Sequence, residues 1–205
     1  MKVINLTCDY MANPIGFDFR NPCFGWMTES KAVNGRQKAY QIQISDDERF
    51  GNLIADTGWV ESDLSACVRI DPVLSPRTRY YWHVRIRNDA GGESEWSETA
   101  WFETAKYGEP WSARWIGWNR EFPQLRKSFK VDKPVASARA YACGVGLYAM
   151  YLNGERIGDE YLAPGFTAYD SWIQYQTYDI TEQLRQGENV IGSQLGNGYY
   201  KGRVN

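Results

Sequence analysis

The chain has 205 residues, of which 43% are hydrophobic and 23% are charged, and its formal net charge is −2. This composition is typical of a globular protein, and the length allows one large domain or two small ones. The near-neutral charge offers no basic surface for nucleic acid or an anionic membrane, and the absence of a long apolar run excludes a transmembrane helix.

Aromatic residues are unusually dense, at 15% of the chain with 9 Trp and 14 Tyr. Small all-β domains favour such residues because each ring buries a large area in a thin core. Proteins that stack against sugar rings favour them as well. Composition therefore leaves a structural and a sugar-binding interpretation open.

The first half of the chain has the pattern of a β-sandwich. Residues 39–45 and 80–86 alternate large apolar with polar side chains, the period-2 pattern of half-buried strands. A turn-rich cluster at residues 88–92 precedes a strand expected over residues 96–102. His83, the one histidine, falls on the outer face of its strand, so we expect it to be solvated.

This half resembles a fibronectin type III module. Residues 74–80, Leu-Ser-Pro-Arg-Thr-Arg-Tyr, are similar to that family's Leu-x-Pro-x-Thr-x-Tyr corner, in which the tyrosine hydroxyl bonds back to the backbone. Trp26 takes the place of the core tryptophan on the facing sheet. We therefore expect residues 1–106 to form a fibronectin type III-like β-sandwich whose aromatic side chains fill the core.

A second unit is expected over residues 107–205, after the Gly-Pro break near residue 108. Strands are predicted over residues 125–131 and 137–143. A hairpin over residues 147–158 turns at Asn153-Gly154, a dipeptide that accepts positive φ at both positions.

The end of this unit is predicted to contain one short helix. It covers residues 181–186, with Asp179 or Thr181 as its cap and Gly187 as its stop, and a strand follows from Asn189. The pattern favours a jelly roll, which has about eight strands. Fewer strands are found before Asn205, so we expect a domain that is incomplete at its C-terminus.

The four cysteines, Cys8, Cys23, Cys67 and Cys143, form no Cys-x-x-Cys pair, and a single histidine is too few for a Cys/His zinc site. We expect free buried thiols, with a Cys8–Cys23 disulfide as the alternative. The N-terminus shows no apolar stretch of a signal peptide, which leaves both the bacterial cytoplasm and the periplasm open.

Residues 144–149 match the Gly-x-Gly-x-x-Ala dinucleotide fingerprint. The fingerprint requires a helix directly afterwards, whose N-terminus holds the pyrophosphate. The turn at Asn153-Gly154 comes too early for that helix, so we interpret the glycines as strand-end or bulge positions.

Glycoside hydrolysis requires two carboxyl groups that flank the scissile bond. The candidates in this chain are Asp159, Glu160, Asp170 and Asp179. A thin sandwich face rarely shields a carboxyl group enough to raise its pKa. We therefore assign these residues to surfaces and turns and predict no catalytic residue.

A longer run of motifs in the second unit carries a family resemblance. It comprises Tyr-x-x-Gly-x-Gly-x-Tyr from residue 141, Leu-Ala-Pro-Gly from residue 162, Tyr-Gln-Thr-Tyr-Asp-Ile-Thr from residue 175, and Leu-Gly-Asn-Gly-Tyr-Tyr-Lys-Gly from residue 195. This order is similar to the N-terminal sandwich of bacterial α-L-rhamnosidases of glycoside hydrolase family 78. Asn-Pro-x-Gly-x-Asp from residue 13 extends the resemblance to the first unit.

The resemblance implies a large inverting glycosidase that removes terminal α-L-rhamnose. Its acid and base would be carboxylates of a downstream helical barrel, which would be the partner of this region in the same enzyme. The chain itself is then expected to be an inactive accessory fragment. The alternative is a stand-alone adhesive or structural protein of tandem sandwiches.

In some family relatives the second sandwich resembles a carbohydrate-binding module that uses calcium. For a rhamnose-containing glycan, the expected binding residues are Asp159, Glu160, Tyr169, Trp172 and Tyr199. Asp159 is the expected calcium ligand, since calcium prefers carboxylate and carbonyl oxygens. No cofactor is otherwise expected.

Overall fold

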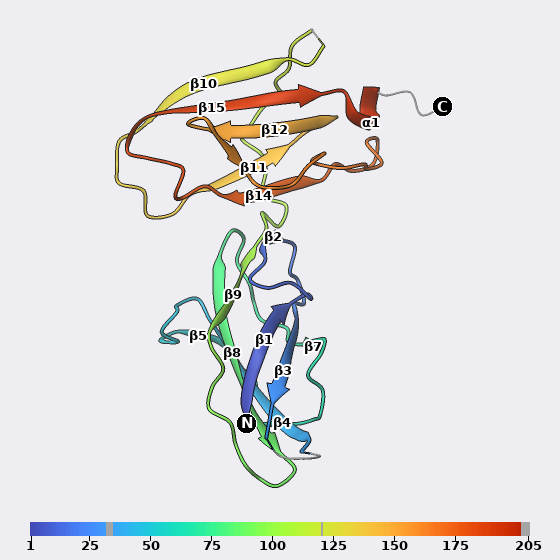
Figure 1. The fold of residues 1–205 in the computed structure, drawn as a ribbon, viewed down its shortest axis with the longest axis vertical. Coiled ribbons are helices and arrows are strands. Elements are labelled where there is room, and N and C mark those ends of the chain that lie inside the picture. Colours follow the sequence, from blue (N-terminus) through green and yellow to red (C-terminus); the bar gives the residue numbers. More distant parts are fainter. Residues whose placement is uncertain (32–34, 120, 202–205) are drawn as a thin grey trace. The chain divides into compact units, whose positions relative to one another are not determined.

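The computed structural model describes residues 1–31, 35–119 and 121–201. The chain divides into two compact units, Met1–Glu109 and Pro110–Asn205, and the regular secondary structure of each is almost entirely β-strand (Figure 1). The prediction of an all-β protein is therefore confirmed. Within the described ranges, no helix is long and apolar enough to cross a membrane.

The first unit is a sandwich of two sheets. The smaller sheet has the order β1-β3-β7, with β1 (Lys2–Cys8), β3 (Cys23–Glu29) and β7 (Val68–Arg69). The larger sheet has the order β2-β9-β8-β4-β5, with β6 paired to β4. Its strands are β2 (Ile15–Phe17), β4 (Gln37–Ser45), β5 (Leu53–Asp56), β6 (Val60–Glu61), β8 (Arg79–Asn88) and β9 (Ala100–Thr104). Fibronectin type III and immunoglobulin domains share this sandwich architecture.

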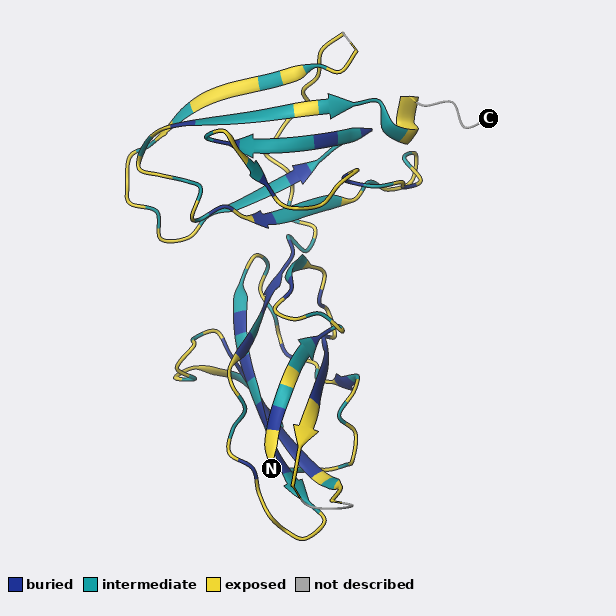
Figure 2. Ribbon diagram, in the orientation of Figure 1, coloured by how far each residue is buried: buried dark blue, intermediate teal, exposed yellow. Residues whose placement is uncertain are grey.

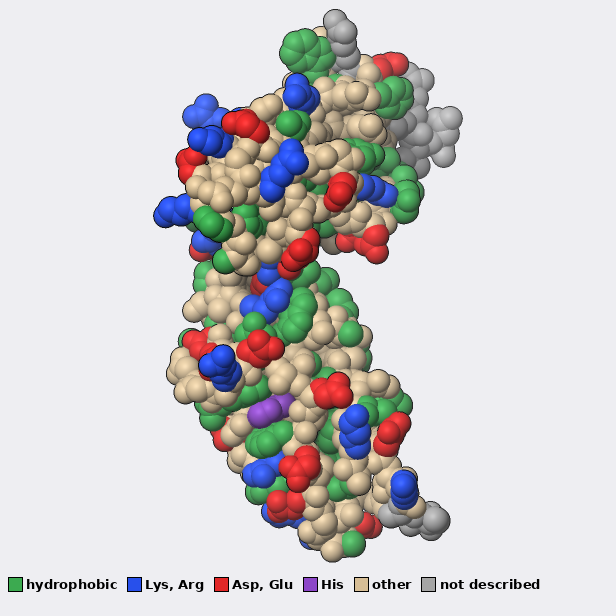
Figure 3. Space-filling view, turned by 60° about the vertical axis from the view of Figure 1, so that its left-hand side comes forward, with side chains coloured by type: hydrophobic (Ala, Val, Ile, Leu, Met, Phe, Trp, Pro, Cys, Tyr) green, Lys and Arg blue, Asp and Glu red, His purple; other side chains and the backbone are tan. Residues whose placement is uncertain are grey.

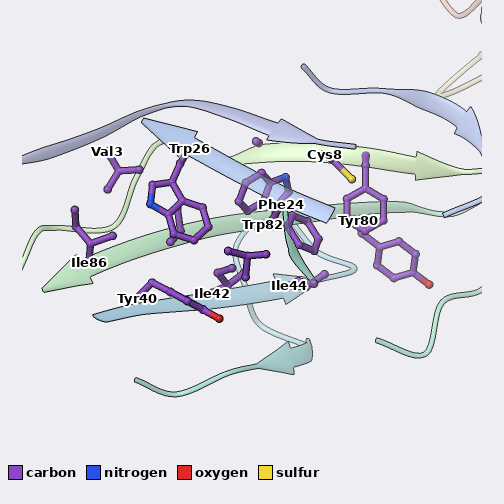
Figure 4. Close-up of a cluster of buried hydrophobic side chains, with 14 of the residues drawn as sticks. Val3, Cys8, Phe24, Trp26, Tyr40, Ile42, Ile44, Tyr80, Trp82 and Ile86 are labelled. Carbon is purple, nitrogen blue, oxygen red and sulfur yellow. The ribbon is translucent and has the colours of Figure 1, made fainter. Parts of the chain in front are cut away.

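The core of the first unit lies between its two sheets (Figure 4). Strand alternation places Tyr80, Trp82, Val84 and Ile86 of β8 on one face, and each is at most 2% exposed. From the smaller sheet, Phe24 packs on Trp82 with ring centroids 4.6 Å apart. The period-2 prediction for this strand is confirmed.

Two details of the fibronectin-like pattern are confirmed. Trp26 of β3 is buried, and its indole N–H donates a hydrogen bond to Gln37 Oε1 at 3.0 Å. At the corner, the Ser75 backbone N–H donates to the Tyr80 hydroxyl oxygen at 2.8 Å. The tyrosine therefore fixes the loop that leads into β8.

His83 is only partly exposed, because aromatic side chains cover both faces of its ring, so the prediction of a solvated side chain was wrong. Its imidazole stacks between Phe50, at a centroid distance of 3.7 Å, and Trp96, at 3.9 Å, and its Nε2 lies 2.9 Å from Gln43 Oε1. Burial, followed by the positive charge of Arg85, lowers the pKa of His83 to about 4. The strand does direct His83 to the outer face (purple in Figure 3), but aromatic side chains from two loops cover that face.

The last strand of this unit begins at Ala100 and not at residue 96 as predicted. The side-chain oxygens of Ser94 and Ser97 accept hydrogen bonds from the backbone N–H groups of Ile86 and Val84, at 3.0 and 3.1 Å. Side chains thus occupy β8 donors that a regular ladder would pair with backbone carbonyls. The segment therefore runs beside β8 without becoming a regular strand.

All four cysteines are free thiols, and the Cys8–Cys23 disulfide is not formed. Cys8 and Cys23 are buried, as predicted. Cys67 and Cys143 are only partly buried.

The second unit also contains two sheets. The larger has the order β10-β15-β12-β13, and the smaller pairs β11 with β14. The strands are β10 (Gln124–Val131), β11 (Arg139–Cys143), β12 (Leu147–Leu152), β13 (Glu155–Ile157), β14 (Tyr175–Asp179) and β15 (Gly187–Gly196), and a one-turn helix α1 (Gly198–Lys201) follows. In the described part of this unit the strands number six, against about eight in a jelly roll. Residues 203–205, where no closing strand is predicted, lie outside the described residues.

The predicted hairpin of the second unit is confirmed. β12 and β13 pair in an antiparallel manner around Asn153 and Gly154, whose φ values are 54° and 91°. Asparagine and glycine tolerate these left-handed positions better than other residues. The sequence therefore determines this turn locally.

The short helix predicted over residues 181–186 is wrong. A turn lies there, in which the N–H groups of Gln183 and Leu184 both donate to the Ile180 carbonyl. The buried side chain of Asn189 accepts from the Arg185 N–H at 3.2 Å and donates to the Arg185 carbonyl at 2.7 Å. Since Asn189 uses these backbone groups, the turn does not continue as a helix.

The second half of the Gly-x-Gly-x-x-Ala segment belongs to strand β12, and the turn at Asn153 follows in place of a helix, as predicted. Gly146 has a φ of 107°, and a Cβ there would lie 2.6 Å from the Gly196 carbonyl oxygen. The glycine therefore permits a close approach of the start of β12 to the end of β15.

The larger sheet of the second unit is only partly covered. A hollow of about 540 Å³ is lined by residues 111 and 113–116 together with parts of β10, β11, β12 and β15. Its apolar lining includes Leu125, Tyr141, Leu147, Ile191 and Leu195, and all five are only partly buried. The core of this unit thus remains open along one side.

Candidate functional site

Four aromatic side chains meet at the surface of the second unit, and we call them the aromatic cluster: Phe166, Tyr169, Tyr199 and Tyr200. Phe166 and Tyr169 belong to the connection between β13 and β14, whereas Tyr199 and Tyr200 belong to α1. Phe166, Tyr199 and Tyr200 are 68%, 50% and 55% exposed. The cluster therefore presents apolar ring surface to the solvent.

The rings of the cluster contact one another edge to face. Phe166 lies 5.5 Å from Tyr199 and 6.0 Å from Tyr169 between ring centroids, and Tyr169 lies 5.3 Å from Tyr200. The interplanar angles are 79°, 85° and 76°. Such contacts use the positive edge of one ring against the negative face of another and hold the rings in defined orientations.

Two hydroxyl groups in the same connection are buried without a hydrogen-bond partner. They are Thr167 Oγ1 and the Tyr169 hydroxyl oxygen. Buried polar groups in folded proteins usually have a partner, which can be an ordered water or a ligand. The cluster therefore combines exposed ring faces with polar groups that can still accept or donate hydrogen bonds.

The structure brings together two of the five binding residues predicted from the sequence. Tyr169 and Tyr199 meet through Phe166. Trp172 is 57% exposed in the same connection, and its backbone N–H donates to the Ala168 carbonyl, but the ring contacts of the cluster do not include it. Phe166 was not among the five predicted residues, and Tyr200 was not singled out, although the adjacent Tyr199-Tyr200 pair was a visible signal.

Asp159 and Glu160 lie just after β13 and are exposed. The Arg156 side chain donates to the Glu160 carbonyl oxygen, and its guanidinium lies 4.2 Å from the Tyr161 ring centroid. Glu160 also faces Tyr178, whose hydroxyl pKa is raised by burial first and by the Glu160 charge among the smaller causes. The described contacts of Glu160 are thus with Arg156 and Tyr178 and not with the aromatic cluster.

These residues do not fit a calcium ion well. Calcium takes six to eight oxygen ligands, several of them carboxylates. Throughout residues 1–31, 35–119 and 121–201, no group of three or more His, Cys, Asp or Glu side chains is arranged to hold a metal. Of the carbonyl oxygens near Asp159, that of Glu160 already accepts a hydrogen bond from Arg156.

Two family models match the chain. Residues 3–108 match the Rha78A-like, N-terminal immunoglobulin domain, and residues 133–205 match the alpha-L-rhamnosidase N-terminal domain. The first match assigns to the immunoglobulin type a unit that the sequence indicated as fibronectin type III-like. Both types share the sandwich described above.

The relatives that match along nearly the whole chain are α-L-rhamnosidases. An α-L-rhamnosidase of Formosa agariphila is 33% identical over 92% of this chain and 23% of its own length, and one of Alteromonas sp. is 31% identical over 94% and 23%. The solved α-L-rhamnosidase from Dictyoglumus thermophilum is 34% identical with a TM-score of 0.90, over 98% of this chain and 25% of that one. The enzyme from Aspergillus terreus is 28% identical with a TM-score of 0.79, over 100% and 25%.

The chain thus spans about a quarter of the length of these relatives. The family models cover both units, and the solved relatives superpose along nearly the whole chain. The chain therefore belongs to the α-L-rhamnosidase family and corresponds to its N-terminal region.

Proposed function

We propose that this chain is the non-catalytic accessory region of an enzyme that hydrolyses terminal α-L-rhamnose. The observation that carries the proposal is that both matching models are N-terminal domains, while the chain spans about a quarter of its relatives. The acid and base carboxylates would then belong to a downstream helical barrel of the same enzyme, which is the partner of this region.

An activity assay tests this proposal. The purified chain is expected to leave p-nitrophenyl α-L-rhamnoside unhydrolysed, because hydrolysis needs a positioned acid and base. The product of the complete parent gene, assayed in parallel, is expected to hydrolyse it. Turnover by the chain alone at a rate similar to the complete product would refute the accessory role.

The rival function is a stand-alone adhesive or structural protein built from two sandwiches. The sequence of the native gene downstream of the codon for Asn205 distinguishes the two functions. A reading frame that continues past Asn205 into a helical-barrel domain supports the accessory role, and a stop codon after Asn205 supports the rival.

A finer role, binding of a rhamnose-containing glycan, is supported by the aromatic cluster. Phe166 and Tyr199 are at least half exposed, and an exposed ring face can stack on the apolar side of a sugar. The buried hydroxyls of Thr167 and Tyr169 offer hydrogen-bonding groups nearby. We propose the cluster as the sugar contact of this region.

Calorimetry with L-rhamnose at millimolar concentration tests the sugar contact. Tyr199→Ala is expected to weaken binding roughly tenfold, since it removes one stacking ring. Tyr161→Ala is the matched control, because Tyr161 is 82% exposed and lies outside the cluster. Equal heats for the two variants, or no heat with the unsubstituted chain, would assign the cluster to structure alone.

A further inference from the structure

The hollow of the second unit leaves apolar side chains uncovered on the inner face of the four-stranded sheet. Ile191 and Leu195 of β15 pack against the core cluster of this unit, yet both also line the hollow and are only partly buried. The inner face of a sandwich is normally covered by side chains of a facing sheet. Part of that cover is missing over the hollow, and exposed apolar surface of this kind marks a contact with another segment or molecule.

A basic side chain, that of Lys127, belongs to the same inner face. Because side chains alternate along a strand, Lys127 points to the face of β10 that also carries Leu125 and Phe129. The register places Lys127 directly opposite Ile191, and Phe129 packs against the core cluster. Lys127 lines the hollow, and the described lining residues include no Asp or Glu. An ammonium group that becomes covered there needs an anionic partner from the covering segment.

The polypeptide leaves β15 beside this hollow. A Cβ at Gly198, the first residue of α1, would lie 2.8 Å from Leu147 Cγ, and Leu147 lines the hollow. On the smaller sheet, β11 lines the hollow, and among the described strands it pairs with β14 alone. A polypeptide that continues beyond α1 therefore starts close to the uncovered apolar face and to one edge of β11.

We propose that the hollow is the docking site of a β-strand from the downstream part of the parent enzyme. This strand directs apolar side chains toward Ile191 and a carboxylate toward Lys127, and it extends the smaller sheet at β11. The inference rests on the proposed accessory role, which supplies the downstream polypeptide. The chain spans only 23% and 25% of two α-L-rhamnosidases that it matches, so such enzymes are long enough to provide the strand. Docking removes the apolar face from water and pairs the ammonium group.

Lysine acetylation tests the docking site. The purified chain and the product of the complete parent gene are treated with the acetyl ester of sulfo-N-hydroxysuccinimide, digested and analysed by mass spectrometry. Lys127 is exposed in the chain, and its acetylation is expected to be several-fold slower in the complete product. Lys130 is the matched control, because it lies on the other face of β10 with a side chain that is 64% exposed. Its acetylation rate is expected to be the same in both proteins.

Hydrogen exchange and a charge reversal test the strand and its carboxylate. The amides of β11 are expected to exchange several-fold more slowly in the complete product than in the chain, because the docked strand pairs with them. In the complete product, Lys127→Glu is expected to return part of the fast exchange, since it places two carboxylates together. Lys130→Glu is expected to leave the exchange unchanged.

The outcomes separate the docking site from the accessory role. Equal acetylation of Lys127 in the chain and in a complete product that hydrolyses p-nitrophenyl α-L-rhamnoside would overturn the docking site alone. Equal slowing at Lys130 would assign the protection to general burial by the rest of the enzyme and would overturn it as well. Protection of Lys127 that grows with the concentration of the chain alone would assign the hollow to a second copy. A stop codon after Asn205 would overturn both proposals.

Discussion

The two units of the chain bury their cores to different degrees (Figure 2). Among the described residues, the buried hydrophobic core has 15 members in the first unit and 7 in the second, although the units are similar in length. The apolar cluster of the first unit joins residues of both its sheets, whereas a hollow in the second unit leaves residues of β10, β11, β12 and β15 only partly buried. The comparison indicates that one β-sandwich is stabilised mainly by a large apolar cluster and the other by a smaller cluster together with buried hydrogen bonds.

The second unit compensates in part with a buried polar residue. The Asn189 side chain is 0% exposed and makes four hydrogen bonds of 2.7 to 3.2 Å, two with Arg185 and one each with Gly187 and Asn153. These bonds connect the turn before β15 with the hairpin of β12 and β13. The first unit buries a polar side chain at the same depth in Thr104, whose hydroxyl accepts from the Thr78 N–H and donates to the Ser75 carbonyl, but its apolar cluster is the larger of the two.

Two matched truncations give the largest expected effect. Ile42→Ala in the first unit removes a side chain that is 0% exposed, and should cost about 4 kcal/mol of unfolding free energy. Ile191→Ala removes the same atoms from the partly open hollow of the second unit, and should cost about 1 kcal/mol. Urea unfolding, monitored by the hydrogen exchange of amides in each unit, measures the loss of unfolding free energy in that unit. Equal losses would mean that Ile191 is as well buried in solution as Ile42.

Replacement of the buried Asn189 side chain should cause the next largest loss of unfolding free energy. Asn189→Ala leaves several backbone groups near Arg185 without a partner and should destabilise the second unit by about 3 kcal/mol. Tyr80→Phe in the first unit removes only the hydrogen bond from the Ser75 N–H and should cost about 1 kcal/mol. Thermal unfolding of both variants checks this order. A larger loss of stability for Tyr80→Phe than for Asn189→Ala would contradict the inference that the hydrogen bonds of Asn189 stabilise the second unit.

These contrasts also indicate what the sequence can and cannot predict. The alternation in β8 and the Asn153-Gly154 turn are properties of neighbouring residues, so the sequence predicts them directly. The helix over residues 181–186 was wrong because the Asn189 side chain, beyond the end of the predicted helix, uses the Arg185 backbone groups. Local propensity does not include such a competitor.

The candidate site was predictable only in part, for a similar reason. Tyr169 and Tyr199 were selected as exposed rings, but their meeting depends on Phe166 and on a chain reversal between distant segments. His83 shows the same limit, since Phe50 and Trp96 cover it from two loops. Period and composition predict the face on which a residue lies, but not what covers that face.

The stability of the two units should also depend differently on pH, because the first unit contains His83. The folded-state pKa of His83 is about 4, below the ordinary 6.5, so between these values the unfolded chain binds a proton that the folded chain does not. The stabilisation is complete above pH 6.5 and is lost as the pH falls to about 4. Because the ring is partly open to solvent, the loss should be on the order of 1 kcal/mol. The second unit contains no histidine and lacks this contribution.

His83→Phe is the variant that isolates this effect. Phenylalanine can retain the stack between Phe50 and Trp96 but cannot bind a proton. Its first unit should therefore lose less stability between pH 6.5 and 4 than the unsubstituted chain. An identical pH profile for the two proteins would assign the acid sensitivity to carboxylates such as Asp56, whose pKa is also shifted.

The smallest expected effect is that of calcium on the second unit. Asp159 and Glu160 are exposed, and the Glu160 carbonyl is already bound by Arg156, so this segment provides few of the six to eight oxygens that calcium takes. Millimolar calcium chloride should leave the midpoint of thermal unfolding of the second unit unchanged, since a ligand stabilises only the state that it binds. Magnesium chloride at equal ionic strength is the control, and Asp159→Ala is the matched variant. A rise with calcium alone that Asp159→Ala abolishes would restore the calcium site expected from the family resemblance and would show that the loop rearranges to form it.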